Sequence, residues 1–304
     1  NTTASNNTGI GQRALANNTT GYSNTSIGYN ALNANTTGLG NVALGQGSLS
    51  SNTTANDNTA LGRISLTNNT TGTRNTAVGR GSLNANTTSH DNTAVGYFSL
   101  YSSTTGTKNT GLGGYALQQN TTGNENVGTG YNALGANTTG SNNIAVGNWA
   151  LDANTTASFN TGVGHQSLST NSTGSMNAAV GHQALFSNTT GSNNIAVGVY
   201  ALDHNTTGNK NTGIGHNALT ANTTASFNTA VGYNSLNANT TGDDNVAFGK
   251  DALLSNTTGS HNSAFGCESL DVVSTGSHNT ALGKSALGSN TTASDNTSVG
   301  SASL

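Results

Sequence analysis

The chain repeats itself every 17 residues, and the interval does not slip once between Asn1 and Leu304. Eighteen copies of the consensus NTTGSxNTAVGxxALxA fit, the last one lacking only its final two residues. We number the repeat positions 1 to 17 from Asn1, so that position 7 is Asn7, Asn24 and so on. Such a period predicts one tandem array over residues 1–304, in which each copy stacks on the next. Because neither end carries an atypical capping copy, we also expect end-to-end stacking or a place inside a longer fibre.

Comparison of the copies separates a fixed scaffold from a permissive surface. Thr at position 3, Asn at 7, Gly at 11 and Leu at 15 never vary. Position 9 is always Ala, Gly or Ser, position 14 is Ala or Ser, and position 10 is aliphatic or Phe except at Thr129. All Lys, Arg, Asp and Glu residues fall at positions 5, 6, 12, 13 and 16. These five positions are therefore expected to face solvent.

Composition excludes several classes of function. The net charge of −3 and eight scattered basic residues provide no surface for nucleic acid. No apolar run approaches the length of a membrane span, so no membrane insertion is expected. Proline is absent, which leaves every backbone donor available for long hydrogen-bonded ladders. Cys267 is the only cysteine, so no internal disulfide can form.

The repeat predicts an all-β parallel β-solenoid of 18 coils. Seventeen residues are too few for a helix pair but suit one coil of a solenoid. Positions 8 to 10, typically TAV, favour a strand, and the Gly that follows marks a turn or a close backbone approach. At about 4.8 Å per coil, 18 coils would form a rod on the order of 85 Å long.

A single coil buries too little to be stable alone. Position 10 and Leu at position 15 are expected in the core, each worth about 1.5–3 kcal/mol, against an ordering cost of about 1–2 kcal/mol per residue. The small residues at positions 9 and 14 are interpreted as a close-packed contact with another chain. A homotrimeric rod is the preferred interpretation, and a single-chain solenoid is the alternative.

The runs NTAVGYFSL (92–100) and NTAVGYNSL (228–236), joined by NTTG, resemble repeats in bacterial and phage tail-fibre-domain proteins. More distantly, they are similar to the shorter head repeats of trimeric autotransporter adhesins. The resemblance covers the whole chain and implies a trimeric, β-structured extracellular fibre at a cell surface or on a virion. It implies a non-catalytic shaft that spaces or presents a surface-binding end, with a cell-surface glycan or protein as partner.

Position 1 is Asn in 16 of 18 copies, and each opens an N-x-[ST] sequon. The candidate N-glycosylation sites are Asn18, Asn35, Asn52, Asn69, Asn86, Asn120, Asn137, Asn154, Asn188, Asn205, Asn222, Asn239, Asn256 and Asn290. Two copies lose the Asn, at Ser103 and Val273, yet keep the Thr two residues later. This retention favours a structural Thr column with hydroxyl-to-backbone bonds over selection for sugar attachment. The invariant Asn at position 7 is likewise expected to form a ladder along the axis.

No residue pattern in the repeat indicates an enzyme, a metal or a cofactor. His165 and His182 share one position in successive copies, as do His261 and His278, but other copies accept unrelated residues there. Surface histidine is therefore preferred over a metal site. No nucleophile motif occurs, and the acidic calcium-binding nonapeptide is absent.

Two kinds of surface feature remain as functional candidates. Exposed aromatic residues suit sugars or protein partners, although they can equally pack against the next coil. These candidates are Tyr97, Phe98, Tyr101, Trp149 and Tyr200. The rival hypothesis is an ice-binding β-solenoid, because position 3 supplies an unbroken Thr column. Against it, the mostly Thr column at position 8 is interrupted by residues such as Val42 and Ile144.

Overall fold

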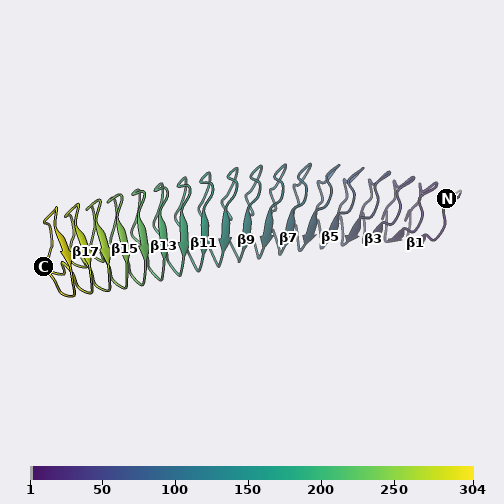
Figure 1. Ribbon diagram of the computed structural model, residues 1–304. Helices are drawn as coiled ribbons and strands as arrows, with labels where there is room; N and C mark the ends of the chain where they lie inside the picture. The colour runs from purple at the N-terminus through teal and green to yellow at the C-terminus, as the bar shows by residue number, and fades with distance from the viewer. Residues whose placement is uncertain (1–2) are drawn as a thin grey trace. The chain divides into compact units, whose positions relative to one another are not determined.

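The computed structural model describes residues 3–304 and is an all-β parallel β-solenoid with a 17-residue repeat (Figure 1). The fold class expected from the period is thus confirmed. The chain divides into two compact units, Asn1–Thr156 and Ala157–Leu304, which are built from the same coil. Each unit contains nine short strands, one in each coil.

Every strand covers repeat positions 8 to 10. In unit 1 the strands are β1 (Thr8–Ile10), β2 (Thr25–Ile27), β3 (Val42–Leu44), β4 (Thr59–Leu61), β5 (Thr76–Val78), β6 (Thr93–Val95), β7 (Thr110–Leu112), β8 (Val127–Thr129) and β9 (Ile144–Val146). In unit 2 they are β10 (Thr161–Val163), β11 (Ala178–Val180), β12 (Ile195–Val197), β13 (Thr212–Ile214), β14 (Thr229–Val231), β15 (Val246–Phe248), β16 (Ser263–Phe265), β17 (Thr280–Leu282) and β18 (Thr297–Val299). The remainder of each coil consists of turns and irregular extended segments.

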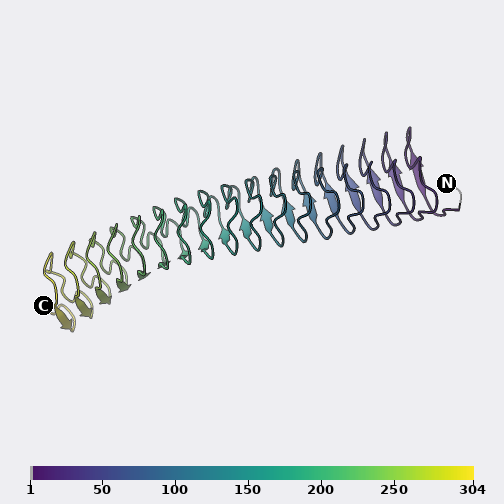
Figure 2. The same ribbon diagram turned by 90° about the horizontal axis from the view of Figure 1, so that it is seen from above.

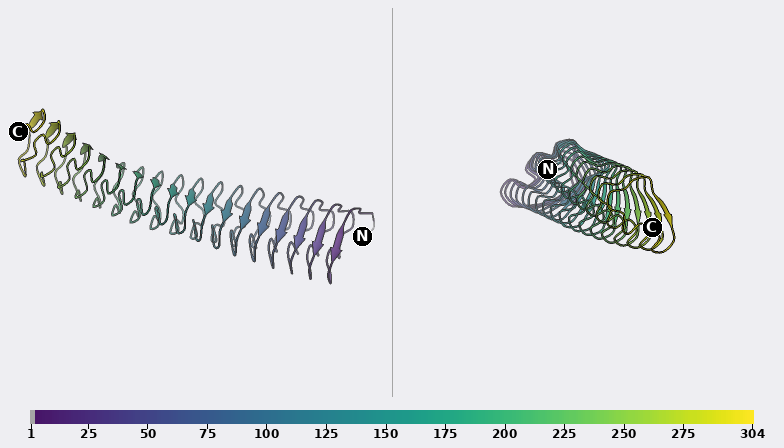
Figure 3. Two further views of the ribbon diagram at one scale, coloured as in Figure 1. Left: turned by 90° about the horizontal axis from the view of Figure 1, so that it is seen from below. Right: turned by 90° about the vertical axis from the view of Figure 1, so that its left-hand side faces the viewer.

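Within each unit, consecutive strands pair in parallel and in unbroken register. Ile195 pairs with Thr212 and Val197 with Ile214, always 17 residues apart. Seen from above and from below, each strand keeps its place in the coil relative to the neighbouring coils of its unit (Figures 2 and 3). Identical side chains therefore lie in columns along each unit.

The invariant Gly at position 11 is required by both the backbone angle and the close approach of the next coil. Gly215 has φ of +137°, and a Cβ there would lie 2.3 Å from the carbonyl oxygen of Gly232. No L side chain fits this place without separating the coils.

Three further positions, 6, 13 and 15, adopt the left-handed conformation in the described coils, apart from Leu304 at the end of the chain. Asn, Asp and Gly are frequent at positions 6 and 13 and tolerate it well. Leu at position 15 does not, yet Leu202 has φ of +54° and is fully buried. Its burial, worth about 1.5–3 kcal/mol, offsets a backbone cost of about 1–2 kcal/mol.

The core of the coil confirms one expectation and corrects two others. Leu at position 15 is buried from Leu32 to Leu287, as expected. Positions 9 and 14, assigned above to a contact between chains, are instead buried inside the coil. Position 10, expected in the core, faces outward, and Val197 is 39% exposed. The reason is the narrow coil: a Cβ on Gly213 at position 9 would already touch the Leu202 side chain at 3.3 Å. One Leu per coil fills the interior.

The Asn at position 7 forms the expected ladder. The backbone N–H of Asn211 donates to Oδ1 of Asn194 in the coil before, at 2.9 Å. Its Nδ2 donates to the carbonyl of Ala225 in the coil after, at 2.7 Å. Each such Asn therefore joins three consecutive coils, which explains why no substitute is accepted.

The Asn at position 1 forms a second ladder. Nδ2 of Asn205 donates to Oδ1 of Asn188 in the preceding coil at 2.9 Å and to the Gly208 carbonyl at 3.1 Å. The two exceptional copies break this ladder. In one, Val273 supplies no donor, and the buried Oδ1 of Asn256 below it has no hydrogen-bond partner. In the other, the hydroxyl of Ser103 is buried and unpaired.

The predicted Thr bonding belongs to position 2 and not to position 3. Oγ1 of Thr189 at position 2 donates to the carbonyl of Thr206 in the next coil at 3.0 Å. The Thr residues at position 3 are exposed from Thr3 to Thr292, and their hydroxyls make no hydrogen bond within residues 3–304. The prediction of a bonded column at position 3 was therefore wrong. Extended backbone turns adjacent side chains to opposite sides, so only one of the two can reach the coil.

Exchanging the residues at position 1 tests the ladder in both directions. We expect Asn205→Val to lower the free energy of unfolding by about 1–3 kcal/mol, because it orphans a buried acceptor. Val273→Asn should raise it by roughly 1 kcal/mol, because the new Nδ2 pairs Asn256 Oδ1. Denaturant unfolding measures both changes. The exposed neighbour provides the control, Val272→Asn, which should change little; equal effects at 272 and 273 would contradict the ladder.

Candidate binding surfaces

The outward face of the strands is a continuous uncharged surface along each unit. Positions 8 and 10 form it, with Thr, Val or Ile in one column except at Ala178 and Ser263, and aliphatic or Phe side chains in the other except at Thr129. No copy places a charged residue at either position. On β15 and β16, the rings of Phe248 and Phe265 stack at 5.4 Å between centroids. This sheet face is uncharged, with an apolar column at position 10 beside a mostly Thr column at position 8, and it is partly solvent-exposed in the chain considered alone.

A row of aromatic rings lies along positions 12, 13 and 16 of unit 1. We define the aromatic edge as Tyr97, Phe98, Tyr101, Tyr115, Tyr131 and Trp149. Four of the predicted aromatic residues thus come together, and sequence reasoning missed Tyr115 and Tyr131. Their alternation between positions 12 and 13 in successive copies concealed the row.

Each ring of the aromatic edge contacts the next. Centroid distances are 5.4 Å from Tyr97 to Tyr115, 5.6 Å from Tyr115 to Tyr131 and 5.7 Å from Tyr131 to Trp149. All three contacts are T-shaped, with interplanar angles of 73–79°. Burial among its neighbours raises the pKa of the Tyr115 hydroxyl. These rings pack on adjacent coils, Tyr97 and Trp149 remain exposed, and Phe98 and Tyr101 are half-buried, so a role in binding stays a prediction.

Tyr200 belongs to a corresponding row in unit 2. Its ring makes edge contacts with His182 at 5.4 Å and with His216 at 6.2 Å. His216 in turn stacks on Tyr233 at 5.5 Å. Imidazoles replace most of the phenol rings, so this row is more polar than the aromatic edge.

The paired histidines stack as flat rings. His165 lies 5.4 Å from His182 at an interplanar angle of 6°, and His261 lies 5.0 Å from His278. Across residues 3–304, no group of three or more His, Cys, Asp or Glu side chains is placed to hold a metal ion. Cys267 is a free, half-buried thiol.

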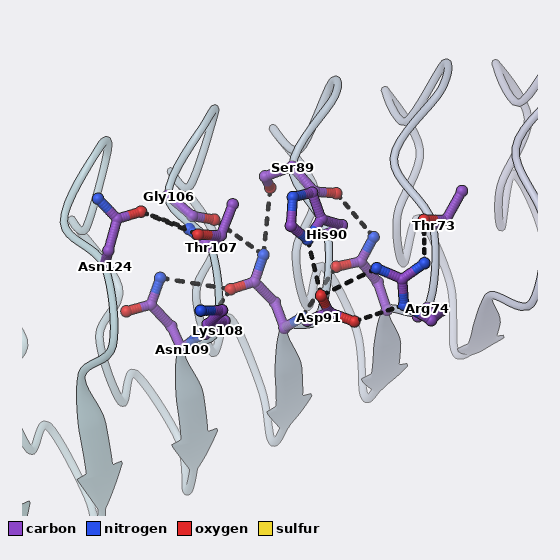
Figure 4. Close-up of polar contacts among 12 residues, drawn as sticks. Thr73, Arg74, Ser89, His90, Asp91, Gly106, Thr107, Lys108, Asn109 and Asn124 are labelled. Carbon is purple, nitrogen blue, oxygen red and sulfur yellow. Dashed lines mark hydrogen bonds and ion pairs between the residues drawn. The ribbon is translucent and has the colours of Figure 1, made fainter.

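The turn at positions 5 and 6 carries ion pairs between neighbouring coils (Figure 4). Arg74 holds both carboxylate oxygens of Asp91, at 2.7 and 3.0 Å, while His90 approaches Asp91 at 2.7 Å. Hydrogen bonds, first from Arg74 and then from His90, hold the pKa of Asp91 well below its usual range. Lys108 pairs with Glu125 in the same manner at 3.2 Å. Exposed ion pairs of this kind add little to the stability of the fold, so the charged residues of this turn are not part of the scaffold that holds the coils together.

The sequon asparagines lie inside the coil. From Asn18 to Asn256, the predicted glycosylation sites are at most 1% exposed, and only Asn290 in the last coil is partly exposed. Sugar attachment uses Nδ2, the atom that Asn205 and its equivalents direct at two acceptors. The geometry thus favours the structural interpretation of this column in the folded chain.

The carboxyl group of Asp203 at position 16 is partly buried, which disfavours its charged form. Its Oδ1 is buried without a hydrogen-bond partner, and His204 lies 3.7 Å from the other oxygen. Burial raises the pKa of the Asp203 carboxyl, although His204 and His182 act in the opposite direction. Other copies place a donor at position 16: Nδ2 of Asn237 bonds the carbonyl of Asn217, which is at position 13 of the preceding coil.

Asp203→Asn should therefore stabilise the protein. The new amide can donate to the equivalent carbonyl, that of Gln183, for a gain of about 0.5–1.5 kcal/mol at pH 7. Because the pKa of the Asp203 carboxyl is raised in the folded state, the unmodified protein loses stability as pH rises above about 3.9. At pH 3 the carboxyl is largely protonated in both states, so the stability gained by Asp203→Asn should be smaller than at pH 7. Thermal unfolding at both pH values measures it. The exposed Asp244→Asn removes the same charge and should change little; an equal gain there would refute the argument.

Comparison with known proteins adds no family assignment. No protein-family model matches the chain, and no curated protein sequence is significantly similar to it. Among residues 3–304, no helix has the length and apolar character needed to cross a membrane.

Proposed function

We propose that the chain is a non-catalytic structural shaft of an extracellular fibre, on a cell surface or a virion, that spaces or presents a surface-binding end. One observation carries this proposal: the invariant residues act between coils. Asn at position 7 bonds the coils on both sides, and Gly at position 11 lets successive backbones approach. Such a scaffold sets length and rigidity, while the variable residues stay outside it.

The proposed shaft assembles from several copies of the chain through the outward sheet face. With strands about 4.8 Å apart and each about 10 Å long, nine strands present on the order of 400 Å². A patch of that size is comparable to the largest apolar patch on a typical soluble monomer, and such patches often mark interaction sites. Each unit thus supplies about half of the roughly 800 Å² that one partner buries in a standard interface.

We propose three copies around a common axis. The resemblance to the repeats of trimeric adhesins supports this number. The face is also only two side chains wide, so positions 8 and 10 can each meet a different neighbour. A single-chain solenoid is the alternative.

Lysine substitutions in the sheet face test the assembly. Val180 and Val197 lie side by side on β11 and β12. Native mass spectrometry should give three chains for the unmodified protein and one chain for the Val180→Lys, Val197→Lys variant, because desolvating two ammonium groups is costly. Thr173→Lys with Thr190→Lys adds the same charge at position 3 of the same two coils and should leave three chains. A monomeric unmodified protein would refute the assembly, and a dimer would refute the threefold arrangement.

Ice binding remains a second candidate function because of one observation. The hydroxyls of the Thr column at position 3 are exposed and unbonded in every described coil, one per coil spacing. A regular hydroxyl array of this kind could match a crystal surface.

Thermal hysteresis separates the two candidates. A shaft should show no gap between the melting point and the freezing point of ice. A gap that Thr173→Lys with Thr190→Lys reduces would support ice binding and overturn the inert shaft.

A further inference from the structure

We propose that the aromatic edge of unit 1 binds an extended acidic polysaccharide, with about one sugar ring for each coil. This binding site is independent of the sheet face and is not required for a structural shaft. Three observations on the described residues support it: the spacing of the rings, their exposed surface and the charge at one end of the row.

The ring spacing follows the coil repeat. Successive centroids from Tyr97 to Trp149 are 5.4–5.7 Å apart. This distance is close to the length of one pyranose in an extended 1,4-linked chain. The apolar C–H face of a pyranose packs on aromatic rings, and the phenol and indole groups supply hydrogen bonds at the rim.

The rings keep surface available for a ligand. A T-shaped contact uses the edge of one ring against the face of the next, so a row of such contacts leaves faces of alternate rings uncovered. Tyr97 is 40% exposed, Tyr131 48% and Trp149 39%. Because ring contacts already order these side chains, the protein loses little side-chain entropy when a ligand binds to them.

The charge beside the row selects an acidic ligand. The guanidinium of Arg80 lies 5.6 Å from the centroid of the Tyr97 ring and 5.5 Å from that of Phe98. Arg63 occupies the same repeat position one copy earlier. At positions 12, 13 and 16 from residue 52 to residue 153, the charged residues are these two arginines at the Tyr97 end and Asp152 at the Trp149 end, so the basic charge is at one end of the row. A guanidinium next to a sugar-stacking surface suits the carboxylate of a uronic acid.

Calorimetry on the full chain tests the site with two hexasaccharides. Both are β-1,4-linked: one consists of mannuronic acid and is acidic, and the other consists of glucose and is neutral. We expect tighter binding of the acidic hexamer. Tyr131→Ala and Trp149→Ala should each weaken it by about tenfold. Arg80→Gln should remove the preference for the acidic hexamer while retaining binding of the neutral one.

Tyr22→Ala is the matched control. Tyr22 is as exposed as Tyr131 but lies at position 5, in the turn before the strand. Its replacement should leave binding unchanged. Three outcomes would each overturn the site. They are that neither hexamer binds, that Tyr22→Ala and Tyr131→Ala weaken binding equally, or that Arg80→Gln keeps the preference for the acidic hexamer. The Val180→Lys, Val197→Lys variant should still bind, so failure of the assembly and failure of this site give different results.

Discussion

The stacking of each coil directly on the next, at the spacing of hydrogen-bonded strands, is the constraint on which the other features depend. It brings backbone against backbone at position 11, where only Gly fits. It also places identical amides one above another, so that Asn at positions 1 and 7 can bond from coil to coil. A residue that fails in this role affects its neighbours, as the unpaired Asn256 Oδ1 beneath Val273 illustrates.

The same stacking makes the coil narrow. One Leu, the two Asn of positions 1 and 7 and the small residues at positions 4, 9 and 14 fill the cross-section, and the aliphatic side chains of position 10 must point outward. Part of this apolar surface therefore stays in contact with water in the isolated chain. This imbalance connects the fold to the proposed assembly, because the sheet face can be removed from water only by another surface.

Function beyond length resides in the variable positions. The scaffold holds them in columns, so a few copies with related residues produce a continuous strip. The aromatic edge arises in this way from rings that four successive copies contribute at positions 12, 13 and 16. The ion pairs of Arg74 and Lys108 lie in another column, at position 6, where they remain exposed and add little stability.

The sequence by itself determined the period, the parallel solenoid, the Asn ladder at position 7, the need for Gly at position 11 and the burial of Leu at position 15, because these follow from repetition and residue chemistry. Only the tertiary structure decided which strand face is inside and which Thr of each pair bonds the backbone. Alternation separates two faces but does not assign them, and left-handed residues at positions 6, 13 and 15 fix the path of the coil. Likewise, the aromatic row required knowledge that positions 12 and 13 of successive copies meet in space.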